Sequence, residues 1–127
     1  MQPILLAATA QADKSRQFYE SLLGLEFVSD QPHALVFDVA GVEFRIQKVE
    51  QVVSVPYTTV GFKTDDIHIE VIALRDKGLV FETYDFLEQD ELGIWTTPDG
   101  AQIAWCRDPD GNVVSLTQHP TQGQHQE

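Results

Sequence analysis

The chain has 127 residues, of which 43% are hydrophobic and 9% aromatic, and its formal net charge at pH 7 is −12. This length and composition predict one ordinary globular domain and exclude a disordered chain. The excess of acidic residues argues against nucleic acid and anionic membrane as partners, and no apolar run is long enough to predict a membrane span.

The first half of the chain predicts four strands and one helix in the order β-α-β-β-β. Asp13 opens a helical pattern with apolar residues spaced by four, and Gly24 is a suitable stop. Ala40 and Gly41 form a turn between two alternating segments. The predicted elements of this half are a helix at residues 13–23 and strands at 3–9, 25–30, 33–39 and 42–49.

After a linker over residues 50–57, the second half predicts the same order of elements. Asp65 or Asp66 caps a helix that stops at Gly78, and the apolar face of this helix carries Ile67, Val71 and Leu74. An Asp-Pro-Asp-Gly turn joins the last two strands. The strands are predicted at residues 58–64, 79–85, 101–107 and 112–118, with a small β element inside the polar loop 86–100, at 93–97.

The repeated order predicts an α+β fold of two paired βαβββ modules, forming a curved, cupped mixed sheet with helices on the outer face. We expect a single domain over residues 1–120, with module one at about 3–49 and module two at about 58–118. The polar residues 119–127 are expected to be a flexible tail. The uncovered concave side of such a sheet requires loops, a partner chain or a ligand to fill it.

Three stretches carry a resemblance to a known family: the helix end SRQFYESLLGLEF, the stretch from GFKTDDI to ALRDKGLVF, and the hairpin AQIAWCRDPDGNVVSLTQ. Over about residues 3–118 the chain resembles the glyoxalase/bleomycin-resistance/extradiol-dioxygenase superfamily, also called the vicinal oxygen chelate proteins. The resemblance implies paired βαβββ modules, a cavity inside the curved sheets and a homodimer.

The resemblance also implies where catalytic members hold a divalent metal, on the first and last strand of each module. In this sequence the four positions are occupied by Ile4, Arg45, Thr59 and Ser115. Isoleucine has no donor atom, arginine has no lone pair, and the two hydroxyls are weak neutral ligands. We therefore predict no metal at this position and no cofactor. The histidines, which show no metal-ligand spacing, are His33, His68, His119 and His125.

Arg45 has two interpretations. On the concave face it would bind the carboxylate, phosphate or enolate of a small ligand. Alternatively, it pairs with a nearby acid at the rim, or a one-residue register shift exchanges it for Phe44 or Ile46. Glu43 is expected on the opposite face of that strand.

The aromatic residues of the second half also have two interpretations. They either line a pocket or pack in the core or in a dimer contact, and the residues concerned are Trp95, Trp105, Tyr57, Tyr84 and Phe86. Cys106 is expected to be a small buried packing residue. The turn residues Asp108, Asp110 and Asn112 are expected to form the turn and not to act as catalysts.

Three functions remain in competition. The first is a metal-independent protein that binds a small organic ligand in the concave pocket, with Ile4, Arg45, Thr59, Ser115, Trp95 and Trp105 as candidate lining residues. The second is a lyase, isomerase or dioxygenase that uses a non-standard site, and the third is a module whose concave face receives another protein. A single cysteine and an N-terminus without the basic residues of a secretory signal favour a reducing, cytoplasmic location.

Overall fold

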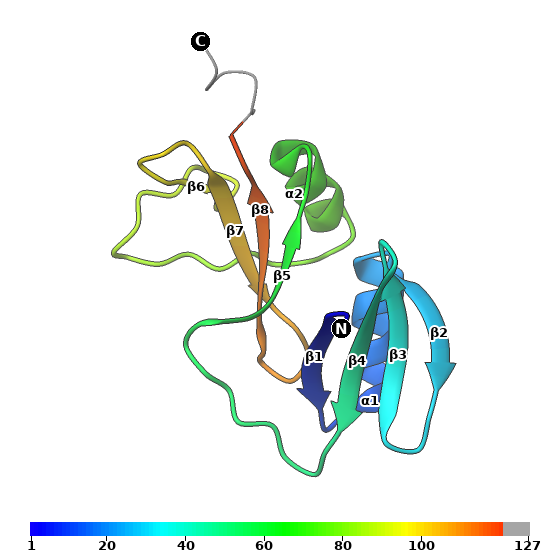
Figure 1. The fold of residues 1–127 in the computed structure, drawn as a ribbon. Coiled ribbons are helices and arrows are strands. Elements are labelled where there is room, and N and C mark those ends of the chain that lie inside the picture. The colour runs from blue at the N-terminus through cyan, green and yellow to red at the C-terminus, as the bar shows by residue number, and fades with distance from the viewer. Residues whose placement is uncertain (121–127) are drawn as a thin grey trace. The chain divides into compact units, whose positions relative to one another are not determined.

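The computed structural model describes residues 1–120, and both halves of the chain contain the predicted order of elements (Figure 1). In the first half these are β1 (Ile4–Thr9), α1 (Ala12–Arg16), the π-helix η1 (Gln17–Leu22), β2 (Glu26–Asp30), β3 (Ala34–Val39) and β4 (Val42–Lys48). In the second half they are β5 (Thr58–Lys63), α2 (Ile67–Asp76), β6 (Trp95–Thr96), β7 (Gln102–Arg107) and β8 (Val113–Gln118).

The eight strands form two four-stranded sheets with equivalent topology, in the orders β1-β4-β3-β2 and β5-β8-β7-β6. In the first sheet β1 runs parallel to β4, whereas β3 is antiparallel to both β4 and β2. Each sheet therefore places the first and last strand of its βαβββ module side by side. The predicted α+β fold built from two such modules is confirmed.

The chain divides into two compact units whose boundaries do not follow the two modules. Unit 1 comprises residues 1–60 together with 107–113, and unit 2 comprises residues 61–106 together with the chain from 114 onward. The turn between β7 and β8 therefore belongs to unit 1, although it lies more than forty residues beyond the rest of that unit in the sequence. No helix within residues 1–120 has the length and apolarity needed to cross a bilayer.

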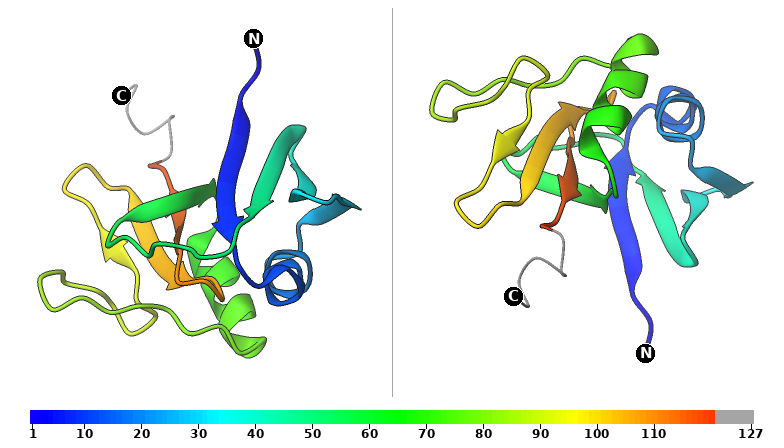
Figure 2. Two further views of the ribbon diagram at one scale, coloured as in Figure 1. Left: turned by 90° about the horizontal axis from the view of Figure 1, so that it is seen from below. Right: turned by 90° about the horizontal axis from the view of Figure 1, so that it is seen from above.

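The core of unit 1 lies between its sheet and the continuous α1–η1 helix, which runs along one face of the sheet (Figure 2). Phe37, Phe44 and Ile46 point toward the helix and are fully buried. Tyr19 of η1 is also fully buried, and its ring packs edge-to-face against Phe44 with 5.3 Å between the ring centroids. The π-helical turn closes with the Leu23 amide donating to the Phe18 carbonyl at 3.0 Å.

The core of unit 2 rests on α2. Of the two predicted cap residues of this helix, Asp65 and Asp66, the cap is Asp66, whose carboxylate accepts the Ile69 amide at 3.1 Å. The predicted apolar face is confirmed, because Ile67, Val71 and Leu74 are all buried. Gly78 ends the helix with φ of +100°, a left-handed conformation that favours glycine.

One predicted strand of the second half differs from the structure. The predicted strand over residues 79–85 is wrong: this segment makes only a single bridge, from Phe81 to Cys106. The small element predicted at 93–97 is present as β6 and takes the edge position of the second sheet. Of the predicted tail 119–127, residues 121–127 and with them His125 lie outside the described residues.

Candidate functional site

A groove of about 490 Å³ opens in unit 1, between β1, the end of β4 and the linker that leads into β5. Its volume is within the range typical of small-molecule sites. Every residue that lines it belongs to unit 1. These residues are Leu6, Ala7, Ala8, Gln47, Val49, Gln51, Val52, Val53, Val55, Tyr57, Thr58, Thr59 and Asn112.

The alternation of side chains along paired strands accounts for the wall that the sheet contributes. Leu6 and Ala8 of β1 lie beside Arg45 and Gln47 of β4 on the face that the helix leaves uncovered. Leu6 is 53% exposed because none of the described helices or strands packs over it. The linker adds valines and Tyr57, which is 66% exposed. The groove is therefore an apolar surface that residues 1–120 do not cover.

The polar side chains of the groove are neutral. Five of them make no side-chain hydrogen bond to any of residues 1–120, so their donors and acceptors are available to a ligand. They are Gln47, Gln51, Tyr57, Thr58 and Thr59. The groove can therefore surround an apolar body and offer amide and hydroxyl groups to it.

Asn112 differs from these five because its side chain is held in place. Its Nδ2 donates to the Ala8 carbonyl at 2.9 Å and to Asp108 Oδ2 at 2.9 Å. Asp108 is 5% exposed, and its Oδ2 also accepts the Tyr19 hydroxyl at 2.7 Å. Its Oδ1 accepts the amides of Asp110 at 3.0 Å and Asn112 at 2.9 Å. The predicted turn is present, and it also fixes β1 at the edge of the groove.

The four positions that correspond to metal ligands in the family have chemistry unsuited to a divalent cation. Ile4 is a half-exposed apolar residue of β1, and Thr59 is the one member of the four that lines the groove. Ser115 is 7% exposed within β8. Within residues 1–120, no three His, Cys, Asp or Glu side chains are grouped so that they could hold a metal ion. The donor set at these positions does not fit a metal.

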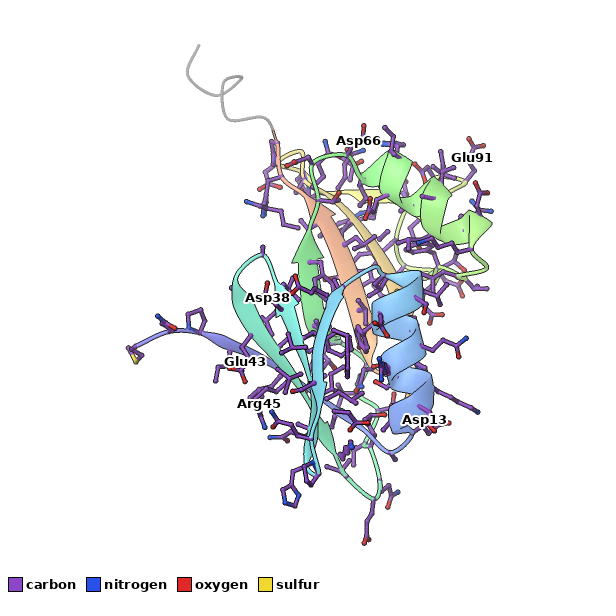
Figure 3. All side chains as sticks on the ribbon, turned by 90° about the vertical axis from the view of Figure 1, so that its right-hand side faces the viewer. Asp13, Asp38, Glu43, Arg45, Asp66 and Glu91 are labelled. Atoms are coloured by element: carbon purple, nitrogen blue, oxygen red, sulfur yellow. The ribbon has the colours of Figure 1, made fainter. Side chains whose placement is uncertain are left out.

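The orientation of Arg45 is now defined. Phe44 and Ile46 are fully buried on the helix side, so Arg45 lies on the uncovered face, as Figure 3 shows. The prediction that Glu43 lies on the opposite face is wrong, because residues two apart in a strand share a face. Arg45 Nη1 donates to Glu43 Oε2 at 3.1 Å, and its Nη2 donates to Gln31 Oε1 at 3.4 Å. Arg45 is thus paired with a nearby acid and does not line the groove.

The aromatic residues of unit 2 form a row separate from the groove. Trp95 and Trp105 stack with 6.2 Å between ring centroids, and Tyr84 meets Trp105 edge-to-face at 5.6 Å. Phe86 lies 5.6 Å from Tyr84 and is 82% exposed. Tyr57, predicted with this set, lines the groove of unit 1 instead. Four of the five predicted aromatic residues therefore lie together.

The remaining candidates for chemistry are dispersed. Cys106 is 1% exposed, in agreement with its predicted packing role. His68 lies 3.9 Å from Asp90 across the surface of unit 2, and both side chains are largely exposed. His33 and His119 are exposed as well. None of these residues lines the groove.

Sequence reasoning did not identify most of the groove. The stretch VVSVPY is predicted as a linker in which only Tyr57 is a pocket candidate, yet its valines line the groove as well. A signal was present: four of the five odd positions of 49–57 are apolar or aromatic, which is more than a solvated linker needs. No sequence pattern identified Gln47 or Gln51 as residues of a binding site.

Solved structures of known proteins share the fold at low sequence identity. Lactoylglutathione lyase from Agrobacterium tumefaciens is similar over 93% of this chain and 94% of its own, with 17% identity and a TM-score of 0.69. The fosfomycin resistance protein FosX from Listeria monocytogenes is similar over 94% and 93%, with 11% identity and a TM-score of 0.73. The antibiotic binding protein TnmS3 from a Streptomyces species is similar over 94% and 98%, with 22% identity and a TM-score of 0.68.

No curated protein matches the sequence. The family model described as Glyoxalase/Bleomycin resistance protein/Dioxygenase superfamily matches residues 3–116, nearly the whole chain. The two βαβββ modules and the Asp-Pro-Asp-Gly hairpin described above agree with that match. The chain belongs to the glyoxalase/bleomycin resistance protein/dioxygenase superfamily.

Proposed function

We propose that this chain is a metal-independent member of the superfamily that binds a small organic molecule in the groove of unit 1. The observation that carries the proposal is the groove itself: about 490 Å³, lined by exposed apolar side chains and by polar groups without a described protein partner. The loss of ligand chemistry at Ile4 and Arg45 supports the metal-independent part.

The apolar lining supplies the driving force for binding. Val53 is 78% exposed and Tyr57 is 66% exposed, so both present apolar surface to water in the unliganded protein. Covering such surface contributes about 25 cal/mol per Å². A ligand that fills the groove would therefore gain affinity from burial and direction from the neighbouring amides and hydroxyls.

Binding is favoured over catalysis by the same lining. The lining residues, all from the described part of the chain, include no carboxylate, imidazole, thiol or amine, and Tyr57 is the one titratable side chain among them. General acid–base or nucleophilic chemistry normally uses a group of one of those kinds. Among the structural relatives, one is described as an antibiotic binding protein and another as a fosfomycin resistance protein. The proposal includes a homodimer in the cytoplasm, to be checked by analytical ultracentrifugation and cell fractionation.

The test uses the uncharged dye Nile red, whose fluorescence rises in apolar sites. We expect saturable binding that is unchanged by EDTA and by added Mn²⁺, Ni²⁺ or Zn²⁺. Tyr57→Ala removes an exposed aromatic wall of the groove and is expected to weaken binding about tenfold, which corresponds to about 1.4 kcal/mol. Phe86→Ala is the matched control, because Phe86 is also an exposed aromatic residue but belongs to the unit 2 row.

Two results would overturn the proposal. Loss of binding after EDTA, restored by a metal, would contradict metal independence. Weakened binding in Phe86→Ala with unchanged binding in Tyr57→Ala would move the site from the groove to the aromatic row of Tyr84, Phe86, Trp95 and Trp105.

A further inference from the structure

We infer that the molecule bound in the groove is uncharged, with an apolar body that carries hydroxyl or carbonyl groups. This inference rests on the proposed function and narrows it to a class of ligand. The groove and the rest of the chain differ sharply in charge: 22% of all residues are charged, yet none of the thirteen lining residues is Asp, Glu, Lys or Arg.

Where β4 ends and the linker begins, neutral and charged residues alternate along the chain. Gln47, Val49 and Gln51 line the groove, whereas the intervening residues Lys48 and Glu50 do not. Lys48 instead forms an ion pair with Asp30. Over residues 47–51 the alternation thus places neutral side chains at the groove and charged ones outside it. Arg45 shares the face of Gln47, but it is paired with Glu43 and does not line the groove.

The charged side chains of the turn beside the groove are also occupied. Asp110 accepts the Thr9 hydroxyl and the Ala10 amide. Arg107 Nη1 donates to the Gly111 carbonyl at 2.8 Å and to Ser54 Oγ at 3.3 Å. Together with the four donors on Asp108, these bonds leave the turn without a spare charge aimed at a ligand.

A charged ligand would therefore lose hydration in the groove and gain no counter-ion there. That desolvation penalty is uncompensated, and it costs far more than the burial of a hydroxyl or carbonyl group that finds a hydrogen bond. The neutral donors and acceptors of Gln47, Gln51 and Tyr57 suit such groups, each bond contributing about 0.5–1.5 kcal/mol. The net charge of −12 adds a general repulsion of anions.

Two pairs of dyes test the inference because each pair changes charge on a nearly constant ring system. Nile red is neutral and Nile blue is its cationic counterpart. N-phenyl-1-naphthylamine is neutral, and 8-anilinonaphthalene-1-sulfonate is its anionic counterpart. At physiological salt, where long-range attraction is screened, we expect the neutral dye of each pair to bind at least about tenfold more tightly.

A charge placed in the groove should change this preference in a defined direction. Gln47→Glu is expected to weaken Nile red binding and strengthen Nile blue binding. The ratio of the Nile red affinity to the Nile blue affinity should therefore fall about tenfold. Gln17→Glu is the matched control: it makes the same change on the exposed surface of η1 and should leave both affinities unchanged.

The outcomes separate this inference from the proposed function. If a charged dye binds as tightly as its neutral counterpart, and Tyr57→Ala weakens it, the site stands and the inference of an uncharged ligand is wrong. If Gln47→Glu and Gln17→Glu act alike, the preference does not arise in the groove and the inference is wrong as well. If no dye responds to Tyr57→Ala, the proposed function and the inference fall together.

Discussion

The buried contact between Tyr19 and Asp108 allows a quantitative test of what holds unit 1 together. The Tyr19 hydroxyl donates to Asp108 Oδ2 at 2.7 Å, across 89 positions of sequence, and Tyr19 is fully buried. Tyr19→Phe removes this hydroxyl and keeps the ring that packs on Phe44. The substitution therefore isolates the hydrogen bond from the aromatic core.

The expected loss follows from the other partners of the carboxylate. A hydrogen bond to a charged group contributes about 1.5–3 kcal/mol. Asp108 keeps three N–H donors, from Asn112 and Asp110, so we expect the lower end of that range, about 1.5–2 kcal/mol. Asp108→Asn replaces an acceptor oxygen with an NH₂ group that faces other donors. We expect this substitution to lower the free energy of unfolding by at least about 3 kcal/mol.

Urea unfolding followed by circular dichroism measures these losses. Tyr57→Phe is the control, because the Tyr57 hydroxyl is exposed and bonds to no residue among 1–120; its effect should stay within about 0.5 kcal/mol. The double variant of Tyr19 and Asp108 should show coupling of about 0.5–3 kcal/mol. Equal free energies of unfolding for Tyr19→Phe and Tyr57→Phe would refute the reasoning.

Three further predictions concern other elements. Asp66→Ala is expected to lower the free energy of unfolding by about 1 kcal/mol, because it removes the cap of α2. Asp65→Ala should change the free energy of unfolding by less than about 0.5 kcal/mol in the same urea assay. Equal effects of the two substitutions would contradict the cap assignment. Ala40 has φ of +51°, so Ala40→Gly should stabilise the turn by up to about 1 kcal/mol, and a lower urea midpoint would contradict this. The pKa of Asp99 is lowered, chiefly by the hydrogen bond from the Thr97 side chain and then by backbone hydrogen bonds. The stabilisation that the ionised Asp99 contributes is therefore present at neutral pH and is lost as the pH falls through that lowered pKa. Thr97→Val should raise the pKa of Asp99 in a carboxylate NMR titration, and an unchanged pKa would show that the hydroxyl is not the cause.

Elements with a clear local period could be predicted from the sequence. In α2, the spacing of Ile67, Val71 and Leu74 and the stop at Gly78 are set by residues within one helix, and the structure agrees with all of them. The strands of the first module were predicted equally well because each alternates within a few residues. The local sequence pattern was sufficient to predict an element wherever its backbone hydrogen bonds lie within one helix or within a regular sheet.

The segment 79–85 shows where local pattern fails. It has the composition of a strand, but it meets β7 only at the Phe81–Cys106 bridge and the bond from the Glu82 amide to the Trp105 carbonyl, and the side chain of Gln89 bonds to other backbone groups of the segment. Gln89 Oε1 accepts the Tyr84 amide at 2.7 Å, and its Nε2 donates to the carbonyls of Glu82 at 3.0 Å and Gly93 at 2.8 Å. A side chain that satisfies backbone groups across a loop leaves no periodic trace in the sequence.

The candidate site was predicted less well than the fold, for a related reason. Of the six candidate lining residues only Thr59 lines the groove, together with Tyr57 from the predicted aromatic set, and their role in binding stays a prediction. The family resemblance predicted site residues on strands, among them Ile4 and Arg45, whereas the groove is built largely by the linker. Which linker side chains face a strand depends on the tertiary path of the chain, and spacing does not encode that path.

The turn at residues 107–113 has a consequence for how the chain folds during synthesis. A ribosome delivers residues in order, and the first sixty residues of unit 1 emerge well before Asp108 and Asn112. Until those two residues arrive, the Tyr19 hydroxyl lacks its contact to Asp108, and the Ala8 carbonyl lacks its bond across 104 positions of sequence. Unit 1, most of which is made first, is therefore completed only after residues 61–106 of unit 2 have been made, and such long-range closure predicts slow folding for a domain of this size.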